Sequence, residues 1–141
     1  MLVSDKEIKT TQIIKNMILI IDDTKKISTI QQEFNAMFPY LKLEFFKHAH
    51  AIHQGNPKKD MLNSSLTLKQ FRSKHTKGKL EIKEDMKVSD LENSFQVLFG
   101  ISAQVFRKSA GTWIETSVTD DWTLKQQNDE GKDLSDFMKS V

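Results

Sequence analysis

The chain has 141 residues, 38% of them hydrophobic and including nine Phe and two Trp, which is enough for a folded core and too much for a disordered chain. It contains no cysteine, which excludes disulfide bonds and thiol chemistry and favours a cytoplasmic location. The longest apolar run, Met17 to Ile21, is too short to span a membrane, and Met1 to Lys15 lacks the apolar core of a signal peptide, so we expect no membrane partner.

Charge is unevenly distributed along the chain, although the net charge is only +2. Residues 41–83 carry ten basic and three acidic side chains, whereas residues 84–141 carry six basic and eleven acidic ones. The basic stretch could form an anion-binding face. The interpretation we favour is two solvated faces that attract each other, within one molecule or between copies of it.

The first half of the chain predicts a flexible arm followed by a strand, a helix and a second strand. Residues 1–16 are polar and form the expected arm. Met17 to Ile21 is an uninterrupted apolar run, typical of a central strand buried on both faces. Residues 28–38 have the apolar spacing of a helix that Pro39 ends. Leu41 to Phe45 alternates as a half-buried strand does, which completes a βαβ unit with a right-handed crossover.

A polar loop at 49–64 and a short helix at 65–72 lead to a second unit with the same order. Its elements are a strand at Leu80 to Ile82, a helix at 89–99, and a strand at 101–106 that forms a hairpin with 112–118. A short helix from Asp121 and a weakly amphipathic tail at 132–141 follow.

The two helices share a pattern in which Phe34 and Phe38 correspond to Phe95 and Phe99, and the tetrapeptide Thr-Leu-Lys-Gln occurs after each unit. We interpret this as an internal duplication. The predicted fold is α+β, with tandem duplicated βαβ-type units (strand, helix, strand, short helix) whose helices pack on a mixed sheet. The expected divisions are an arm at 1–16, a first repeat at 17–77, a second repeat at 78–131 packed with the first as one domain, and a tail at 132–141.

Four segments match the capping box, in which a Ser or Thr and a Glu or Gln three residues later satisfy backbone N–H groups at a helix start. The predicted pairs are Ser28 with Gln31, Thr67 with Gln70, Ser89 with Glu92, and Thr123 with Gln126. This structural role accounts for the repeated tetrapeptide without a function in binding.

His48 and His50 would point the same way on a strand and could hold Zn²⁺ or Ni²⁺ if His53 or Asp60 supplied a third ligand. We favour a partly exposed cluster without a metal, and the sequence leaves the question open. Three carboxylate pairs fall at predicted turns and helix starts, where Asp is common for local reasons. They are Asp22-Asp23, Glu84-Asp85 and Asp120-Asp121.

Trp113 has no counterpart in the first repeat and lies on the predicted hairpin, where an exposed aromatic side chain could anchor a partner together with Arg107 and Lys108. The default expectation for both Trp113 and Trp122 is core packing. The side chains expected in an anion-binding face are Lys58, Lys59, Lys69, Arg72 and Lys74.

The segment Phe106 to Leu124 resembles small uncharacterised bacterial proteins that carry an Asp-Asp-x-Thr-Leu signature after a βαβ unit; here the signature is Asp120-Asp121-Trp122-Thr123-Leu124. The resemblance covers mainly residues 79–131. The first half departs from it, with Asn63-Ser64-Ser65-Leu66 at the matching place. The resemblance implies a fold and brings no known activity or catalytic residues.

The chain has no Gly-rich phosphate loop, no Gly-x-Ser-x-Gly motif and no His-Glu-x-x-His motif, so we expect neither an enzyme nor a bound cofactor. The leading hypothesis is a non-enzymatic interaction module that binds another protein or a second copy of itself. The alternative is nucleic-acid binding through residues 42–79.

Overall fold

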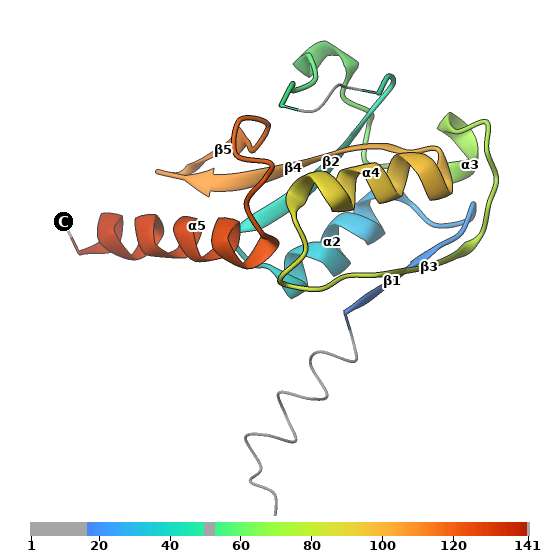
Figure 1. The fold of residues 1–141 in the computed structure, drawn as a ribbon. Helices are drawn as coiled ribbons and strands as arrows, with labels where there is room; N and C mark the ends of the chain where they lie inside the picture. Colours follow the sequence, from blue (N-terminus) through green and yellow to red (C-terminus); the bar gives the residue numbers. More distant parts are fainter. Residues whose placement is uncertain (1–16, 50–52, 141) are drawn as a thin grey trace, which may run out of the picture.

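The computed structural model describes residues 17–49 and 53–140, and within them the chain has an α+β fold (Figure 1). The predicted arm at 1–16 lies outside the described residues. Two antiparallel sheets are present, and every strand of the first unit pairs with a strand of the second. The mixed sheet predicted from two right-handed βαβ units is therefore wrong.

The smaller sheet consists of β1 (Ile18–Ile21) and β3 (Gly78–Glu81), with Leu19 opposite Leu80. The larger sheet has the order β2 (Leu41–Phe46), β4 (Ser102–Ser109), β5 (Thr112–Glu115). In it Leu43 lies opposite Val105. Since β1 and β2 belong to different sheets, the helix between them connects two layers and is not a crossover within one sheet.

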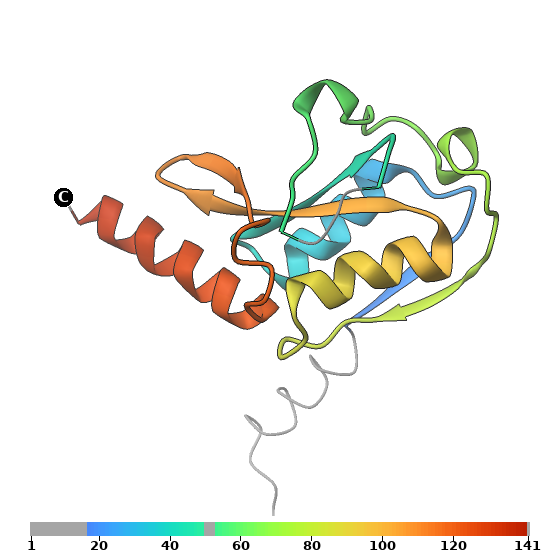
Figure 2. The ribbon, with the colours of Figure 1, turned by 45° about the horizontal axis from the view of Figure 1, so that its top comes forward.

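Two helices, α2 (Ile27–Met37) and α4 (Val88–Phe99), lie between the sheets (Figures 1 and 2). Their apolar faces meet in one core, as the spacing of Phe34 and Phe95 predicted, and both rings are fully buried. Core side chains come from both units, among them Leu19, Ile21, Ile30, Phe34, Leu43, Phe45, Leu80, Leu91, Phe95, Ile101 and Val105.

The strand β1 is not buried on both faces as predicted. Leu19 and Ile21 are buried, but Ile18 and Ile20 are 38% and 42% exposed. The reason is that the two-stranded sheet is covered by helices on one side. A run of consecutive apolar residues does not distinguish this arrangement from a central strand.

Helices α2 and α4 both begin before their predicted caps, Ser28 and Ser89. Lys26 and Lys87 are the N-cap residues and their side chains make no capping hydrogen bond. Instead, the N–H groups of Ile27 and Ser28 donate to carbonyl oxygens of the segment before α3, at 2.9 Å each. Ser28 and Ser89 are therefore not the capping residues, because a second backbone segment satisfies the helix start.

The same backbone hydrogen bonds occur in the two units. Ile27 N–H donates to the Leu66 carbonyl oxygen at 2.9 Å, and Val88 N–H donates to that of Trp122 at 3.0 Å. Isolated bridges join Lys26 to Thr67 and Lys87 to Thr123 in corresponding places. The duplication stays a prediction, and this agreement supports it.

The short helix α3 (Leu68–Phe71) and the long helix α5 (Leu124–Lys139) have Thr67 and Thr123 as N-caps, as predicted. The Gln126 N–H donates to Thr123 Oγ1 at 3.1 Å, and the Thr123 N–H donates to Gln126 Oε1 at 2.8 Å. The 16-residue α5 crosses the expected boundary between 131 and 132. No helix in the described ranges is long and apolar enough to cross a membrane.

Gly131 allows α5 to approach the larger sheet. A Cβ atom at this position would lie 2.8 Å from the Cβ of Tyr40, so a side chain would push the helix away. Beyond this contact the helix extends past the sheet (Figures 1 and 2), where Phe137 and Met138 are 62% and 50% exposed. The other special turn is the two-residue hairpin loop Ala110-Gly111, with positive φ at both positions.

We expect Thr123→Ala to lower the free energy of unfolding by about 0.5–2 kcal/mol, because it removes the side-chain acceptor for the Gln126 N–H. Urea denaturation followed by circular dichroism measures this. Thr123→Ser keeps the hydroxyl oxygen and serves as the control. Equal stability of the Ala variant and the wild type would contradict the capping role.

Candidate functional site

The β4–β5 hairpin presents an aromatic surface flanked by lysines. Lys108 on β4 lies opposite Trp113 on β5, with its Nζ 5.7 Å from the ring centroid. The Nζ of Lys42, on β2, lies 5.2 Å from the same ring and 5.3 Å from that of Phe106. We call Lys42, Lys108 and Trp113 the Trp113 surface, and the buried Phe106 lies beneath it. The two cations stack on Trp113 and so limit the orientations of its ring.

Arg107 is separate from this surface. Since side chains alternate along a strand, Arg107 points to the face of β4 opposite Lys108. There its Nη1 donates to Gln127 Oε1 at 2.7 Å, and its guanidinium lies 5.6 Å from the Trp122 ring centroid. The predicted partner-binding group is therefore divided: Trp113 and Lys108 lie together, and Arg107 binds α5. Trp122 is 37% exposed and not a core residue as expected by default.

The sequence did not indicate Lys42, because it lies far from the hairpin along the chain. Lys42 is also 3.4 Å from Glu44, so its charge is partly balanced, whereas Lys108 makes no ion pair with any described residue. Next to the surface is a shallow groove of about 320 Å³ between polar residues of α2 and the strands. Its lining residues are Ser28, Gln31, Gln32, Asn35, Lys42, Glu44 and Trp113.

The two edges of the larger sheet differ. Side chains of α2 cover the edge of β2, where Gln31 Nε2 donates to the Leu43 carbonyl oxygen at 2.8 Å and Asn35 Nδ2 to that of Leu41 at 2.9 Å. By contrast, β5 pairs with β4 alone among the described strands. It is therefore the edge at which backbone groups remain available for another strand.

The predicted anion-binding face is not formed as a unit. Arg72 has a fully buried side chain; its Nε lies 2.9 Å and its Nη2 2.8 Å from Asp23 Oδ1, and its Nη1 donates to the Phe99 carbonyl oxygen at 3.1 Å. Lys74 Nζ donates to the carbonyl oxygen of Val97 near the end of α4 at 2.8 Å. Arg72 is thus inaccessible to an external anion and Lys74 is already bonded. Exposed positions remain on the 3-10 helix η1 (Lys58–Asp60) and on α3, namely Lys58, Lys59 and Lys69.

The sequence predicts only a local turn role for Asp23. In the structure its carboxylate links the β1–α2 turn to Arg72 and His75, which lie in the segment before β3. Partial desolvation of its carboxylate would raise its pKa, but hydrogen bonds from Arg72 and His75 lower the pKa below the ordinary 3.8. The basic stretch is therefore neutralised partly by Asp22 and Asp23 of the first unit. The sequence instead predicts this role for the acidic second half.

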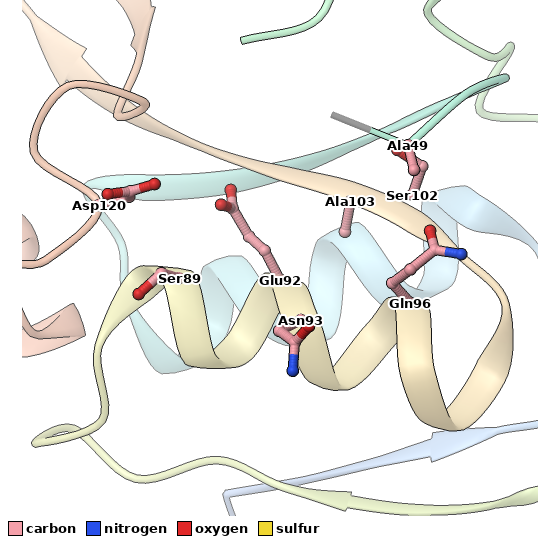
Figure 3. Close-up of a pocket in the computed structure, with 8 residues that line it drawn as sticks. All are labelled: Ala49, Ser89, Glu92, Asn93, Gln96, Ser102, Ala103 and Asp120. Carbon is pink, nitrogen blue, oxygen red and sulfur yellow. The ribbon is translucent and has the colours of Figure 1, made fainter. Parts of the chain in front are cut away.

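A small polar pocket of about 90 Å³ lies between α4 and the start of β4 (Figure 3). Glu92 rises from α4 toward the strand and is 6% exposed, and its Oε2 accepts a hydrogen bond from the Val105 N–H at 2.8 Å. It is therefore not the capping partner of Ser89. Asp120, 1% exposed, lies at the same pocket. The complete lining is Ala49, Ser89, Glu92, Asn93, Gln96, Ser102, Ala103 and Asp120.

The predicted histidine cluster is not assembled among the described residues. His48 contributes its backbone carbonyl, which accepts from Ser102 Oγ at 2.7 Å, and His50 lies outside the described residues. His53 instead meets Asp120 and Asp121, the only group of at least three potential metal ligands within 17–49 and 53–140. The sequence did not predict the contact of His53 with Asp120 and Asp121, because these residues lie far apart along the chain.

Comparisons with protein-family models, with curated proteins and with solved structures give no match to this chain. The resemblance to Asp-Asp-x-Thr-Leu proteins stays a prediction.

Proposed function

We propose that this protein is a non-enzymatic interaction module that binds an extended, acidic segment of another protein along the edge of β5. The observation that carries the proposal is an edge strand that presents Trp113 beside the unpaired cation of Lys108. An added strand would bond to the open backbone edge, which provides affinity, while alternate side chains contact the sheet face, which provides specificity. The proposal includes a cytoplasmic location, with which a chain without cysteine is compatible.

Trp113 has the properties of an anchor. It is half-buried, so part of the ring is already desolvated and held, and part is free to contact a partner. Trp and Arg are enriched among interface residues that contribute most to affinity, whereas Lys at the rim mainly steers association. The acidic character of the partner follows from Lys108, which no described carboxylate neutralises.

The experiment is selection of random peptides on the immobilised protein, with counter-selection on Trp113→Ala. We expect peptides in which apolar and acidic residues alternate, because alternate residues of an added strand face the same side. Binding should fall at least tenfold in Trp113→Ala and in Lys108→Glu. Phe137→Ala, which truncates an exposed aromatic residue on α5, is the matched control and should bind normally.

Three outcomes would contradict the proposal. Peptides with apolar residues three and four apart would indicate that a helix binds, on another surface. Binding unchanged in Trp113→Ala would exclude this edge. Concentration-dependent dimerisation lost in Trp113→Ala would identify a second copy as the partner.

The alternative, nucleic-acid binding through residues 42–79, is tested on the same preparation by fluorescence anisotropy with labelled single- and double-stranded oligonucleotides at two salt concentrations. Binding by several lysines would weaken steeply with salt, since phosphate contacts release counterions. We expect no such binding at physiological salt. Micromolar, salt-sensitive affinity that is removed by Lys58→Glu with Lys59→Glu would favour the alternative.

A further inference from the structure

His53 is held by a buried carboxylate that uses both of its oxygen atoms. Asp120 Oδ1 lies 2.6 Å from His53 Nδ1, and Asp120 Oδ2 accepts a hydrogen bond from the His53 N–H at 3.0 Å. The backbone of His53 has φ of 64°, a conformation that non-glycine residues seldom adopt. One backbone hydrogen bond and one close contact of the ring with the same buried carboxylate therefore hold this residue.

This contact determines which ring nitrogen is available. A lone pair on Nδ1 would repel a carboxylate oxygen only 2.6 Å away, so this contact favours the proton on Nδ1 and, in a neutral imidazole, leaves the lone pair on Nε2. The same carboxylate–histidine arrangement orients histidine ligands in metal sites. His53 is about half exposed, and its Nε2 is directed toward Asp121, whose carboxylate is exposed.

Nε2 and Asp121 Oδ2 are 3.8 Å apart, which is too long for a hydrogen bond. Two ligands that each lie about 2.0–2.2 Å from one zinc ion are separated by roughly 3–4 Å. The spacing thus suits two ligands of one ion. All three side chains offer a ligand atom within 4.8 Å of the others.

We propose that His53 Nε2 and the Asp121 carboxylate bind a divalent transition metal ion, Zn²⁺ in the first place, with Asp120 as the residue that positions His53. One imidazole and one carboxylate are donors that Zn²⁺ accepts. Water would occupy the other coordination positions. The site is therefore open and exchangeable, and its affinity is lower than that of a site with four protein ligands.

The chain offers a matched control in His75. Its ring is 52% exposed against 51% for His53, and its Nδ1 lies 2.7 Å from Asp23 Oδ2. However, Asp23 also pairs with Arg72, and the neighbouring Asp22 is 3.7 Å from Lys77 Nζ. The positive charges of Arg72 and Lys77 disfavour a bound metal ion beside His75. His75 therefore has a carboxylate contact similar to that of His53 but is not expected to bind a metal ion.

The test is isothermal titration of the full chain with ZnCl₂ near neutral pH, together with imidazole ¹⁵N NMR spectra. We expect saturable binding of one Zn²⁺ and a shift of the His53 Nε2 resonance. His53→Ala and Asp121→Asn should each weaken binding at least tenfold, and His75→Ala should leave it unchanged. Asp121 is exposed, so its substitution keeps the test valid if His53→Ala unfolds the protein.

Asp120→Asn tests the positioning role. It should weaken Zn²⁺ binding by about 10–100-fold, as for other residues that orient metal ligands, and change the tautomer signature of His53 in the metal-free ¹⁵N spectrum. A purely structural role of Asp120 would leave that signature unchanged. The proposal is wrong if no saturable binding occurs up to millimolar Zn²⁺, or if binding survives both His53→Ala and Asp121→Asn.

Discussion

Phe95→Ala is expected to lower the free energy of unfolding by about 3–5 kcal/mol, the largest effect that we predict for a single substitution in this protein. The ring is fully buried and packs edge-on against Phe45 on β2, with 5.7 Å between centroids. Its removal costs the transfer free energy of the ring and leaves a cavity between the helix and the larger sheet. Urea denaturation monitored by circular dichroism measures the loss.

Val97→Ala on the same helix is the control, since Val97 is 59% exposed and its truncation should change stability by about 0.5 kcal/mol or less. Phe34→Ala, in the corresponding place on α2, should resemble Phe95→Ala. A cost below about 1 kcal/mol for Phe95→Ala would show that this part of the core repacks around the lost ring.

Glu92→Ala is expected to lower the free energy of unfolding by about 1–3 kcal/mol, because it removes the acceptor of a buried backbone donor. The Val105 N–H lies beside the end of β5, and Glu92 Oε2 accepts its hydrogen bond at 2.8 Å. With alanine at position 92 that N–H loses this carboxylate as acceptor. Thermal and urea unfolding measure the change.

Glu92→Gln separates the loss of a hydrogen bond from the loss of a charge. The amide oxygen of Gln can accept from the Val105 N–H, so this variant should retain more stability than Glu92→Ala. In addition, exchange of the Val105 amide proton should accelerate in Glu92→Ala. Equal stability of wild type and Glu92→Ala, with unchanged exchange at Val105, would contradict this role of the carboxylate.

The local features of the fold could be predicted from the sequence. The burial of Phe34 and Phe95 followed from helical spacing, since residues three and four apart share a face. Thr67 and Thr123 were recognised as caps because the partner of each is three residues away. The hairpin after β4 was recognisable because Gly111 adopts positive φ without strain.

Strand pairing was decided by the tertiary structure. The apolar pattern of β1 and β2 fits a strand in any sheet, and the pairing of Leu19 with Leu80 and of Leu43 with Val105 depends on segments far apart in the chain. This long-range pairing turned the predicted mixed sheet into two antiparallel sheets. It also made β5 an open edge while side chains of α2 cover β2.

The roles of polar side chains divide in the same way. By itself the sequence determined where the two amphipathic helices and most strands form and that Thr67 and Thr123 are caps, because those patterns lie within a few residues. Only the tertiary structure decided that Arg72 is buried against Asp23. The same is true of the hydrogen bonds that Glu92 accepts from the Val105 N–H and Asp120 from the His53 N–H. A charged residue has the same local pattern whether it faces solvent or a distant partner, and burial, which separates the two cases, is set by the packing of the whole chain.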